Sequence, residues 1–488
     1  MVQGVRLTAI SVALLASIAQ GSEAQAPQTD SRATVVQPES LNDLFRPGPQ
    51  YDNQFYDADA QLEIYGGKTA FDPPRAFEMF RPIYTEGPFK PGADALGVDN
   101  LIFPAVAIYG DLRTAVAYND NGTDHESQIA TRLNVDIDVK LTGTERIHAF
   151  IRPLDDGANF TRHRFSGSQA NDSDMIFDPE LETLFFEGDW GALMAGWTGK
   201  TSSYDLPFAF GLIPLTFQNG IWMDDAITGF AISSTAKNSK TLDISNYDVT
   251  FFAGFDRITS AALSNDNDAD LYGLAVFADA NQGHWEGGIA RVNGKDALAG
   301  LDYTSAGLAF TKRYLDRVSN SFRVISSFGQ KPPSGVEQTA DGTMILIENS
   351  LVTSSPSTYV PYANFFVGFD KPQPLADETG LLKNTGISFE TDGLTGFPKL
   401  DDTGEDAYGG ALGVQYLFNL DQQIVLEVAT VIPRDTNRVG AVAEQSALSA
   451  RYQKPIAKDW IVRFDAIYAE REALEDVGGV RAELRFKF

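Results

Sequence analysis

The stretch Val480–Phe488, VRAELRFKF, decides the fold class, because apolar and charged side chains alternate along its whole length. The apolar positions are Val480, Ala482, Leu484, Phe486 and Phe488, and the charged positions are Arg481, Glu483, Arg485 and Lys487. Successive side chains of a strand point to opposite faces, so this pattern predicts a strand with one apolar and one charged face. A membrane barrel turns the apolar face toward lipid and the charged face toward its lumen.

The same alternation recurs upstream. Apolar residues alternate with charged and polar ones along Arg132–Leu141, a tight-turn sequence follows at Thr142–Glu145, and Arg146–Arg152 repeats the pattern. Trp460–Tyr468 also alternates and places aromatic residues at both ends of its apolar face, as the interfacial girdles of membrane barrels require. Several such segments in one chain indicate a barrel wall.

Candidate strands continue from about Phe103 onward and alternate between short and long connections, which is the asymmetry of periplasmic turns and outer loops. We therefore predict an all-β fold, a transmembrane antiparallel up-and-down β-barrel of about 18 strands, formed by residues 103–488. The weakest candidates are Ala226–Ser234 and Gly342–Val352, and without them the count falls to roughly 16.

Composition narrows the function. The net charge of -28 and the pI near 4.4 argue against nucleic acid as a partner. The chain has no cysteine, which excludes thiolate nucleophiles and cysteine metal sites. Beyond the first residues we find no apolar run of about 18 residues that could form a transmembrane helix.

The N-terminal region is expected to stand apart from the barrel. Arg6 and the apolar run Leu7–Ala19 precede small residues, so residues 1–24 are predicted to be a signal peptide. Residues 25–102 are rich in proline and show little alternation. We expect them to form a periplasmic extension or a segment inserted into the lumen.

Two motifs resemble those of bacterial outer-membrane porins. One is the final strand ending in Phe488. The other is Leu184–Trp197, where a strand is expected to end in an acidic residue and glycine and the next strand to run through Gly-x-Leu-x-x-Gly. Length and inward arginines look like substrate-specific porins or the alginate-export type of barrel. The resemblance implies a passive channel for small hydrophilic solutes, anionic ones among them, in the outer membrane of a Gram-negative bacterium. It implies outer-membrane lipid and, through the last strand, the barrel-assembly machinery as partners, with a homotrimer as a possible assembly.

By strand parity, charged side chains of the first and last strands should line the pore. They are Arg113, Arg132, Asp136, Asp138, Lys140, Arg146, His148, Arg152, Arg451, Arg463, Asp465, Arg481, Glu483 and Arg485. Arginines can recognise carboxylates and phosphates in bidentate fashion, so this wall could guide anions. Alternatively, the interleaved acids pair with the arginines and merely keep the pore wet, which is the interpretation we favour from sequence.

The segment Lys200–Asp224 is unusually apolar for a loop, so we expect it to be packed against something. A constriction loop folded into the lumen is the favoured interpretation, with Phe208, Phe210, Leu212, Phe217 and Trp222 as its large side chains. Contact with a neighbouring subunit and capping of the barrel mouth are the alternatives.

No cofactor is expected. The acidic runs Asn265–Asp270 and Asp401–Asp406 could gather calcium, but solvated loop tips are the favoured interpretation. The chain has no H-E-x-x-H or G-x-S-x-G motif, so we predict a channel and no enzyme. A polysaccharide export conduit, a barrel enzyme and a barrel plugged by its N-terminal segment remain alternatives.

Overall fold

The computed structural model describes residues 74–83, 92–157, 159–263, 267–353, 358–390, 393–418, 422–435 and 442–488. All of them belong to one of two compact units, the one that includes Thr69–Phe488. The predicted signal peptide, residues 1–24, lies outside the described residues, as does most of the segment 25–102.

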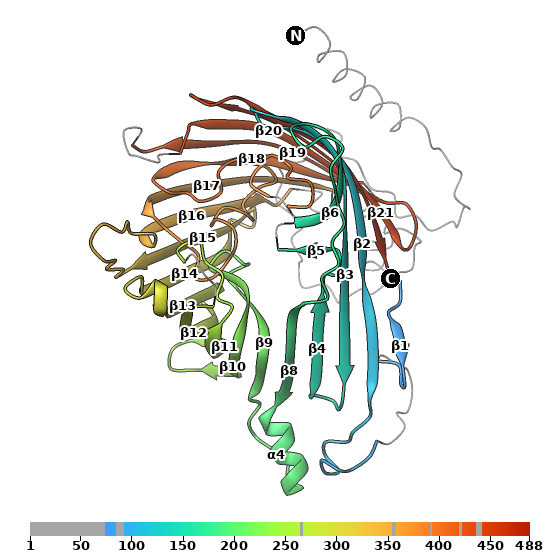
Figure 1. The fold of residues 1–488 in the computed structure, drawn as a ribbon. Coiled ribbons are helices and arrows are strands. Elements are labelled where there is room, and N and C mark those ends of the chain that lie inside the picture. Colours follow the sequence, from blue (N-terminus) through green and yellow to red (C-terminus); the bar gives the residue numbers. More distant parts are fainter. Residues whose placement is uncertain are drawn as a thin grey trace. The chain divides into compact units, whose positions relative to one another are not determined.

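The described chain forms a closed antiparallel barrel of 18 strands, which confirms the predicted fold class and strand number (Figure 1). In order around the wall the strands are β2 (Ala105–Asp120), β3 (His125–Lys140), β4 (Arg146–Ile151), β8 (Leu181–Asp189), β9 (Pro207–Phe217), β10 (Met223–Ser239), β11 (Ile244–Asp256), β12 (Ala269–Ala280), β13 (Gly283–Gly294), β14 (Tyr303–Tyr314), β15 (Val318–Phe328), β16 (Asp341–Leu351), β17 (Tyr359–Lys371), β18 (Ala407–Phe418), β19 (Gln422–Pro433), β20 (Gln445–Pro455), β21 (Trp460–Arg471) and β22 (Val477–Lys487). Strand β22 pairs with β2 from Asp111↔Lys487 to Asp120↔Gly478 and closes the ring. Closure leaves the wall without free strand edges.

Short additional elements attach to this ring. Strand β1 (Phe77–Met79) pairs with β2 at Val106–Ile108. Strand β3 pairs with β4 along one half and with β6 (Asn159–Ser166) along the other. Two-residue strands β5 (Asp155–Asp156) and β7 (Ser173–Asp174) pair with β6, and the 3-10 helix η1 spans Asp296–Leu298.

The connections differ between the two ends of the barrel. Residues 141–145, 240–243, 281–282, 315–317 and 456–459 form short turns at one end, and the longest connections, 152–180, 329–340 and 372–406, lie at the other. By the usual asymmetry of these barrels, the short turns face the periplasm.

At the end of the barrel that carries the short turns, the connection between β8 and β9 contains a helix. This corrects the predicted Leu184–Trp197 hairpin, in which a second strand was expected. After β8 the chain forms α4 (Trp190–Thr198), not a strand. The Asp189 side chain accepts a hydrogen bond from Ala192 N at 2.8 Å, and Gly199 ends the helix with a φ of 63°. An aspartate N-cap and a left-handed glycine are strong helix-end signals, and here they outweigh the strand-like glycine motif. Among the described residues no helix is long and apolar enough to cross a membrane.

The predicted constriction loop Lys200–Asp224 is also corrected, because its central part is strand β9, Pro207–Phe217. Phe208, Phe210, Leu212 and Phe217 lie in this strand, which pairs with β8 and β10. Both of its faces are apolar: Phe210 is exposed on the outer face, whereas Ile213 is buried on the inner one. Periodicity therefore gave no strand signal. Trp222 lies in the turn after β9 and is fully buried.

The connection that enters the lumen is residues 372–406, between β17 and β18, which we call the inward loop. Its Leu375, Leu382 and Phe389 are buried in the main hydrophobic cluster, together with side chains of β9–β17. Leu375 N donates to Trp222 O at 2.6 Å, and Tyr303 Oη donates to Leu375 O at 3.1 Å.

Candidate functional site: the charged lumen

The inward loop contacts inward-facing side chains from separate parts of the wall. Thr395 O accepts hydrogen bonds from Asn119 Nδ2 of β2 at 2.5 Å and from Gln128 Nε2 of β3 at 2.7 Å. The buried Glu427 of β19, a strand that β20–β22 separate from β2, accepts hydrogen bonds from Ile387 N at 2.9 Å and Ser388 N at 2.8 Å. Tyr303 of β14, on the side opposite β2, contacts the loop through Leu375. The loop is thus fixed across the lumen through its backbone.

The last strands gather three arginines around one carboxylate, which we call the Asp465 cluster. Asp465 of β21 lies 2.7 Å from Arg451 Nε, 2.8 Å from Arg463 Nε and 2.9 Å from Arg481 Nη2. Glu390 of the inward loop reaches the same group, at 2.8 Å from Arg451 Nη1 and 3.8 Å from Arg463 Nη2. Arg481 also lies over the Phe397 ring of the loop, 5.2 Å from its centroid.

A second group lies where the barrel closes. Asp111 of β2 is 3.3 Å from Arg113 Nε and 3.6 Å from Arg485 Nε, and it accepts a hydrogen bond from Asn134 Nδ2 at 2.6 Å. Arg485 Nη2 also lies 3.3 Å from Glu483 Oε1. Pairing of β2 with β22 brings together residues from the first and the last strand of the barrel, which are far apart in the sequence.

A third group lies on β3, β4 and β8. Arg146 pairs with Asp138 at 3.5 Å, and His148 lies 3.0 Å from Glu187 Oε1. The remaining predicted residues have these neighbours: Arg132 pairs with Asp155 at 3.2 Å, Arg152 with Glu182 at 2.7 Å, Lys140 lies 5.1 Å from the Phe103 ring centroid, and Asp136 lines a cavity. The predicted charges thus lie mostly in ion pairs, as in the alternative favoured from sequence.

Inward charges on the opposite side of the barrel were missed by the sequence analysis. Strand register places Asp248 of β11 and Glu286 of β13 in one row on either side of Phe277. Glu348 of β16 pairs with Arg323 of β15 at 2.8 Å. Parity was the signal that could have found these residues. They make this side more acidic than the side formed by β20–β22 and β2–β4.

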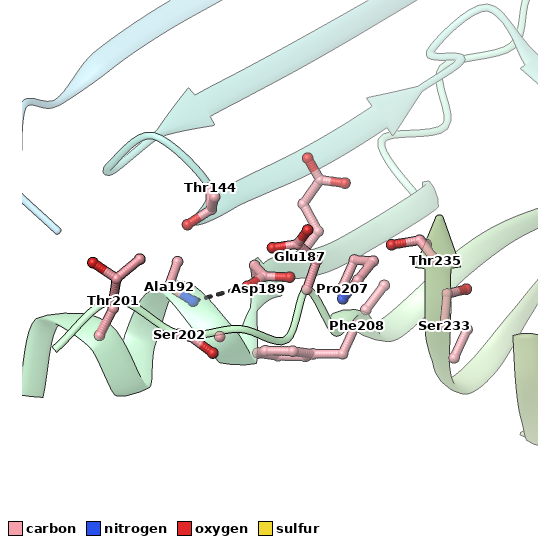
Figure 2. A pocket seen from close by; sticks show the side chains of 16 residues that line it. Thr144, Glu187, Asp189, Ala192, Thr201, Ser202, Pro207, Phe208, Ser233 and Thr235 are labelled. Atoms are coloured by element: carbon pink, nitrogen blue, oxygen red, sulfur yellow. Dashed lines mark hydrogen bonds between the residues drawn. The ribbon is translucent and has the colours of Figure 1, made fainter. Parts of the chain in front are cut away.

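Two cavities open between the lumen walls toward the short-turn end. One, of about 850 Å³, is lined by residues that include Asp111, Arg113, Asn134, Asp136 and His148. The other, of about 750 Å³, lies between β8, α4, β9 and β10. Figure 2 shows Glu187, Asp189, Ala192, Ser233 and Thr235 around this second cavity.

The side chains of the acidic run Asp401–Asp406 form hydrogen bonds and ion pairs with other residues of the protein. Asp401 accepts a hydrogen bond from Thr403 N at 3.1 Å, Asp402 pairs with Lys399 at 2.5 Å, and Asp406 pairs with Arg434 at 3.2 Å. The described residues include no group of three His, Cys, Asp or Glu that could hold a metal. Asn265 and Asp266 of the other run lie outside the described residues, so solvated loop tips there, with calcium as the alternative, stay a prediction.

Burial shifts the ionisation of two carboxyl groups in the inward loop. Burial raises the pKa of Asp401, although hydrogen bonds from Thr403 act in the opposite direction. Burial also raises the pKa of Asp377, which forms a salt bridge with Lys383. Both carboxyl groups therefore hold a proton more tightly in the docked loop than in water.

These features define the class of protein. A closed barrel of 18 antiparallel strands carries apolar side chains outside and paired charges inside, and one loop crosses its lumen. This is the architecture of a transmembrane β-barrel of the outer-membrane type.

Comparisons with known proteins agree with this class. Residues 93–320 match the model of the family described as Gram-negative porin.

Two crystal structures of OpdK from Pseudomonas aeruginosa share the fold. One, solved with vanillate, has a TM-score of 0.53 at 10% identity and covers 78% of this chain and 98% of that one. The other, in which the protein is also called OccK1, has a TM-score of 0.52 at 10% identity and the same coverage. No curated protein matches the sequence. The chain therefore shares its fold with these outer-membrane porins, and somewhat less than half of it matches the porin family model.

Proposed function

We propose that this chain is a porin of the Gram-negative outer membrane that favours small anionic solutes, in particular those with a carboxylate, and that they pass along its arginine-rich wall. The observation that supports the proposal is the contact between Glu390 and the pair Arg451 and Arg463. A carboxylate from outside the wall already occupies these two guanidinium groups. A solute carboxylate fits the same geometry, because guanidinium groups bind carboxylates through paired N–H donors.

The predicted pore-lining residues form the rest of the path in this proposal. The Asp465 cluster leads to Arg485 and Arg113 at the barrel seam, and Arg146 and His148 lie beyond them toward the short-turn end. Each cation is held by an acid, so a passing anion exchanges one partner for another and does not become trapped. Conduction requires binding that is weak and spread over several sites.

The test is the reversal potential of the refolded protein in a planar bilayer under a potassium chloride gradient. The proposal expects anion preference in the native channel and its loss in Arg451→Gln/Arg463→Gln. Lys458→Gln is the matched control, because it removes a cation from the exposed 456–459 turn and should leave the preference unchanged. Cation preference in the native channel, or an effect of the control as large as that of the double variant, would overturn the proposal.

Two partners belong to the same proposal. The alternating strand that ends at Phe488 supports recognition by the barrel-assembly machinery, and Phe488→Ala should then slow insertion of the exported protein. A homotrimer stays a prediction. Native mass spectrometry of the detergent-extracted protein gives the subunit number, and a monomer would overturn it.

The absence of catalysis also belongs to the proposal. His163 Nδ1 lies 2.7 Å from Ser173 Oγ at an exposed position of the described chain, but no carboxylate hydrogen bond accompanies this pair in the described residues. A Ser–His pair needs such a group to orient the imidazole. Lack of ester hydrolysis by the folded native protein is the expected result.

A further inference from the structure

Helix α4 has two faces of different character. Trp190, Met194 and Trp197 lie on one face and are 48%, 37% and 58% exposed. The other face consists of small residues. Ala192 and Ala195 line the cavity between β8 and β10. Gly191 lies so close to Tyr204 O, and Gly196 so close to Leu96 O, that neither position has room for a side chain. Residues three and four apart share a helix face, so both surfaces follow from the sequence spacing.

Strand register shows which way the bulky face points. The outward residues of β8 are Leu184 and Phe186, and Trp190 has the same parity. Trp190 N donates to Leu206 O at 3.1 Å, which extends the β8–β9 pairing by one step. The tryptophan face of α4 therefore continues the outer, lipid-facing surface, and the small face looks toward the lumen.

The composition of α4 is that of a segment that is not surrounded by water. None of its nine residues, WGALMAGWT, is charged, although the whole chain has a net charge of -28. A helix that is apolar all round is normally covered on every side. In the described residues the small face is covered by protein, whereas the bulky face is exposed.

The positions of the other tryptophans indicate what surrounds the bulky face of α4. Trp285 follows the short turn 281–282, Trp460 follows the short turn 456–459, and both have outward parity. Trp190 and Trp197 lie at the same end of the barrel, and only Trp222 of the five tryptophans lies elsewhere. Tryptophan gathers where the hydrocarbon of a bilayer meets its headgroups.

We propose that α4 is an interfacial helix whose Trp190–Met194–Trp197 face inserts into the headgroup boundary of the periplasmic leaflet. The partner is the lipid surface, reached as a continuation of the outer wall of β8 and β9. Lys200, exposed just after the helix, is placed to meet lipid phosphates. On its opposite face the same helix lines a lumen cavity with Ala192 and Ala195. Lipid contact of the tryptophan face therefore also holds Ala192 and Ala195 in place beside the lumen.

The test is tryptophan quenching in vesicles made with lipids brominated near the headgroup end of the acyl chain. The full chain is refolded, and folding of each variant is checked by heat-modifiable gel mobility. We expect Trp190→Phe/Trp197→Phe to lose about half of the lipid-quenchable emission, because it removes two of four interfacial tryptophans. Trp222→Phe is the control and should lose none, since that side chain is fully buried inside the barrel.

Aqueous iodide distinguishes the remaining outcomes. If Trp190 and Trp197 are quenched by iodide and not by brominated lipid, the face is in water and the proposal is wrong. If neither quencher reaches them, another protein surface covers the face, which also overturns the lipid assignment. Should the double variant fail to fold, the single variants Trp190→Phe and Trp197→Phe give the same readout separately.

Discussion

At the scale of single residues, Asp465 determines the charge balance of the lumen wall. Its carboxylate is the shared partner of Arg451, Arg463 and Arg481, and the Arg481 side chain is almost fully buried. Without this carboxylate, three cations would face one another at short distance. Glu390 then remains as a further acid in contact with the cluster, and it comes from the inward loop, not from the wall.

Replacing Asp465 should therefore destabilise the barrel. We expect Asp465→Asn to lower the free energy of unfolding by on the order of 3 kcal/mol, because it leaves buried cations without their partner. Urea unfolding of the protein in lipid vesicles measures this loss. Asp243→Asn, in the exposed turn between β10 and β11, is the control, and equal stability of the two variants would contradict the assignment.

Replacing Glu390 should change selectivity with little effect on stability. Glu390→Gln frees Arg451 and Arg463 from the loop carboxylate, whose side chain is 41% exposed. We expect the anion-to-cation permeability ratio to rise by a factor of about 2–5, the equivalent of roughly 0.5–1 kcal/mol for an exposed ion pair. The reversal potential gives the ratio, and a fall would mean that Glu390 does not compete with solute anions.

At the scale of elements, the inward loop depends on a few backbone contacts. Buried Glu427 holds the backbone N–H groups of Ile387 and Ser388 and also accepts a hydrogen bond from Tyr362 Oη at 2.5 Å. An ionised acceptor for two backbone donors is stronger than a neutral one. The position of the loop in the lumen therefore responds to a single wall residue.

We expect Glu427→Gln to weaken docking of the inward loop by about 1–3 kcal/mol, because the loop N–H groups lose an ionised acceptor. Single-channel recordings should show a larger or noisier conductance. Glu348→Gln is the matched control, since it removes an inward carboxylate that pairs with Arg323. The same change in both variants would show that wall charge and not loop docking is responsible.

Acid pH should strengthen docking of the inward loop. Burial raises the pKa of Asp401 and Asp377 above the ordinary aspartate value of 3.8, so their contribution to docking is greatest below that value and is lost as the pH rises through the raised pKa. We therefore expect conductance to fall on acidification. Asp401→Asn, which has no proton to bind, should show a weaker pH dependence, and an unchanged one would rule out a role for Asp401.

Some of the secondary structure elements could be predicted from the sequence and others could not. Strands with one polar face, such as β3, β21 and β22, follow from alternation alone. Strand β9 was missed because lipid covers one of its faces and the loop-bearing core covers the other, so both are apolar. Helix α4 was missed because the glycine motif of Leu184–Trp197 predicted a strand, although Asp189 and Gly199 are residues that commonly cap helices. The inward loop has no periodic signal, since its position depends on distant residues such as Trp222 and Glu427.

At the scale of the whole molecule, the strand number and the up-and-down topology could be predicted, because each strand has to cross the bilayer and pair with its neighbours. The ion pairs of the lumen could be predicted only in part. Parity tells which side chains point inward, but partners such as Asp111 and Arg485 meet only because the ring closes. The contribution of the loop residue Glu390 could not be predicted at all.

The central claim is that the barrel is an open channel narrowed by residues 372–406, and single-channel conductance in a planar bilayer tests it most directly. The refolded native protein is compared with a variant in which residues 379–401 are replaced by a short Gly-Ser linker. The account predicts stable open steps for the native protein and larger steps for the variant, with both proteins shown to be folded. Folded native protein without steps, or equal steps in the two proteins, would contradict it.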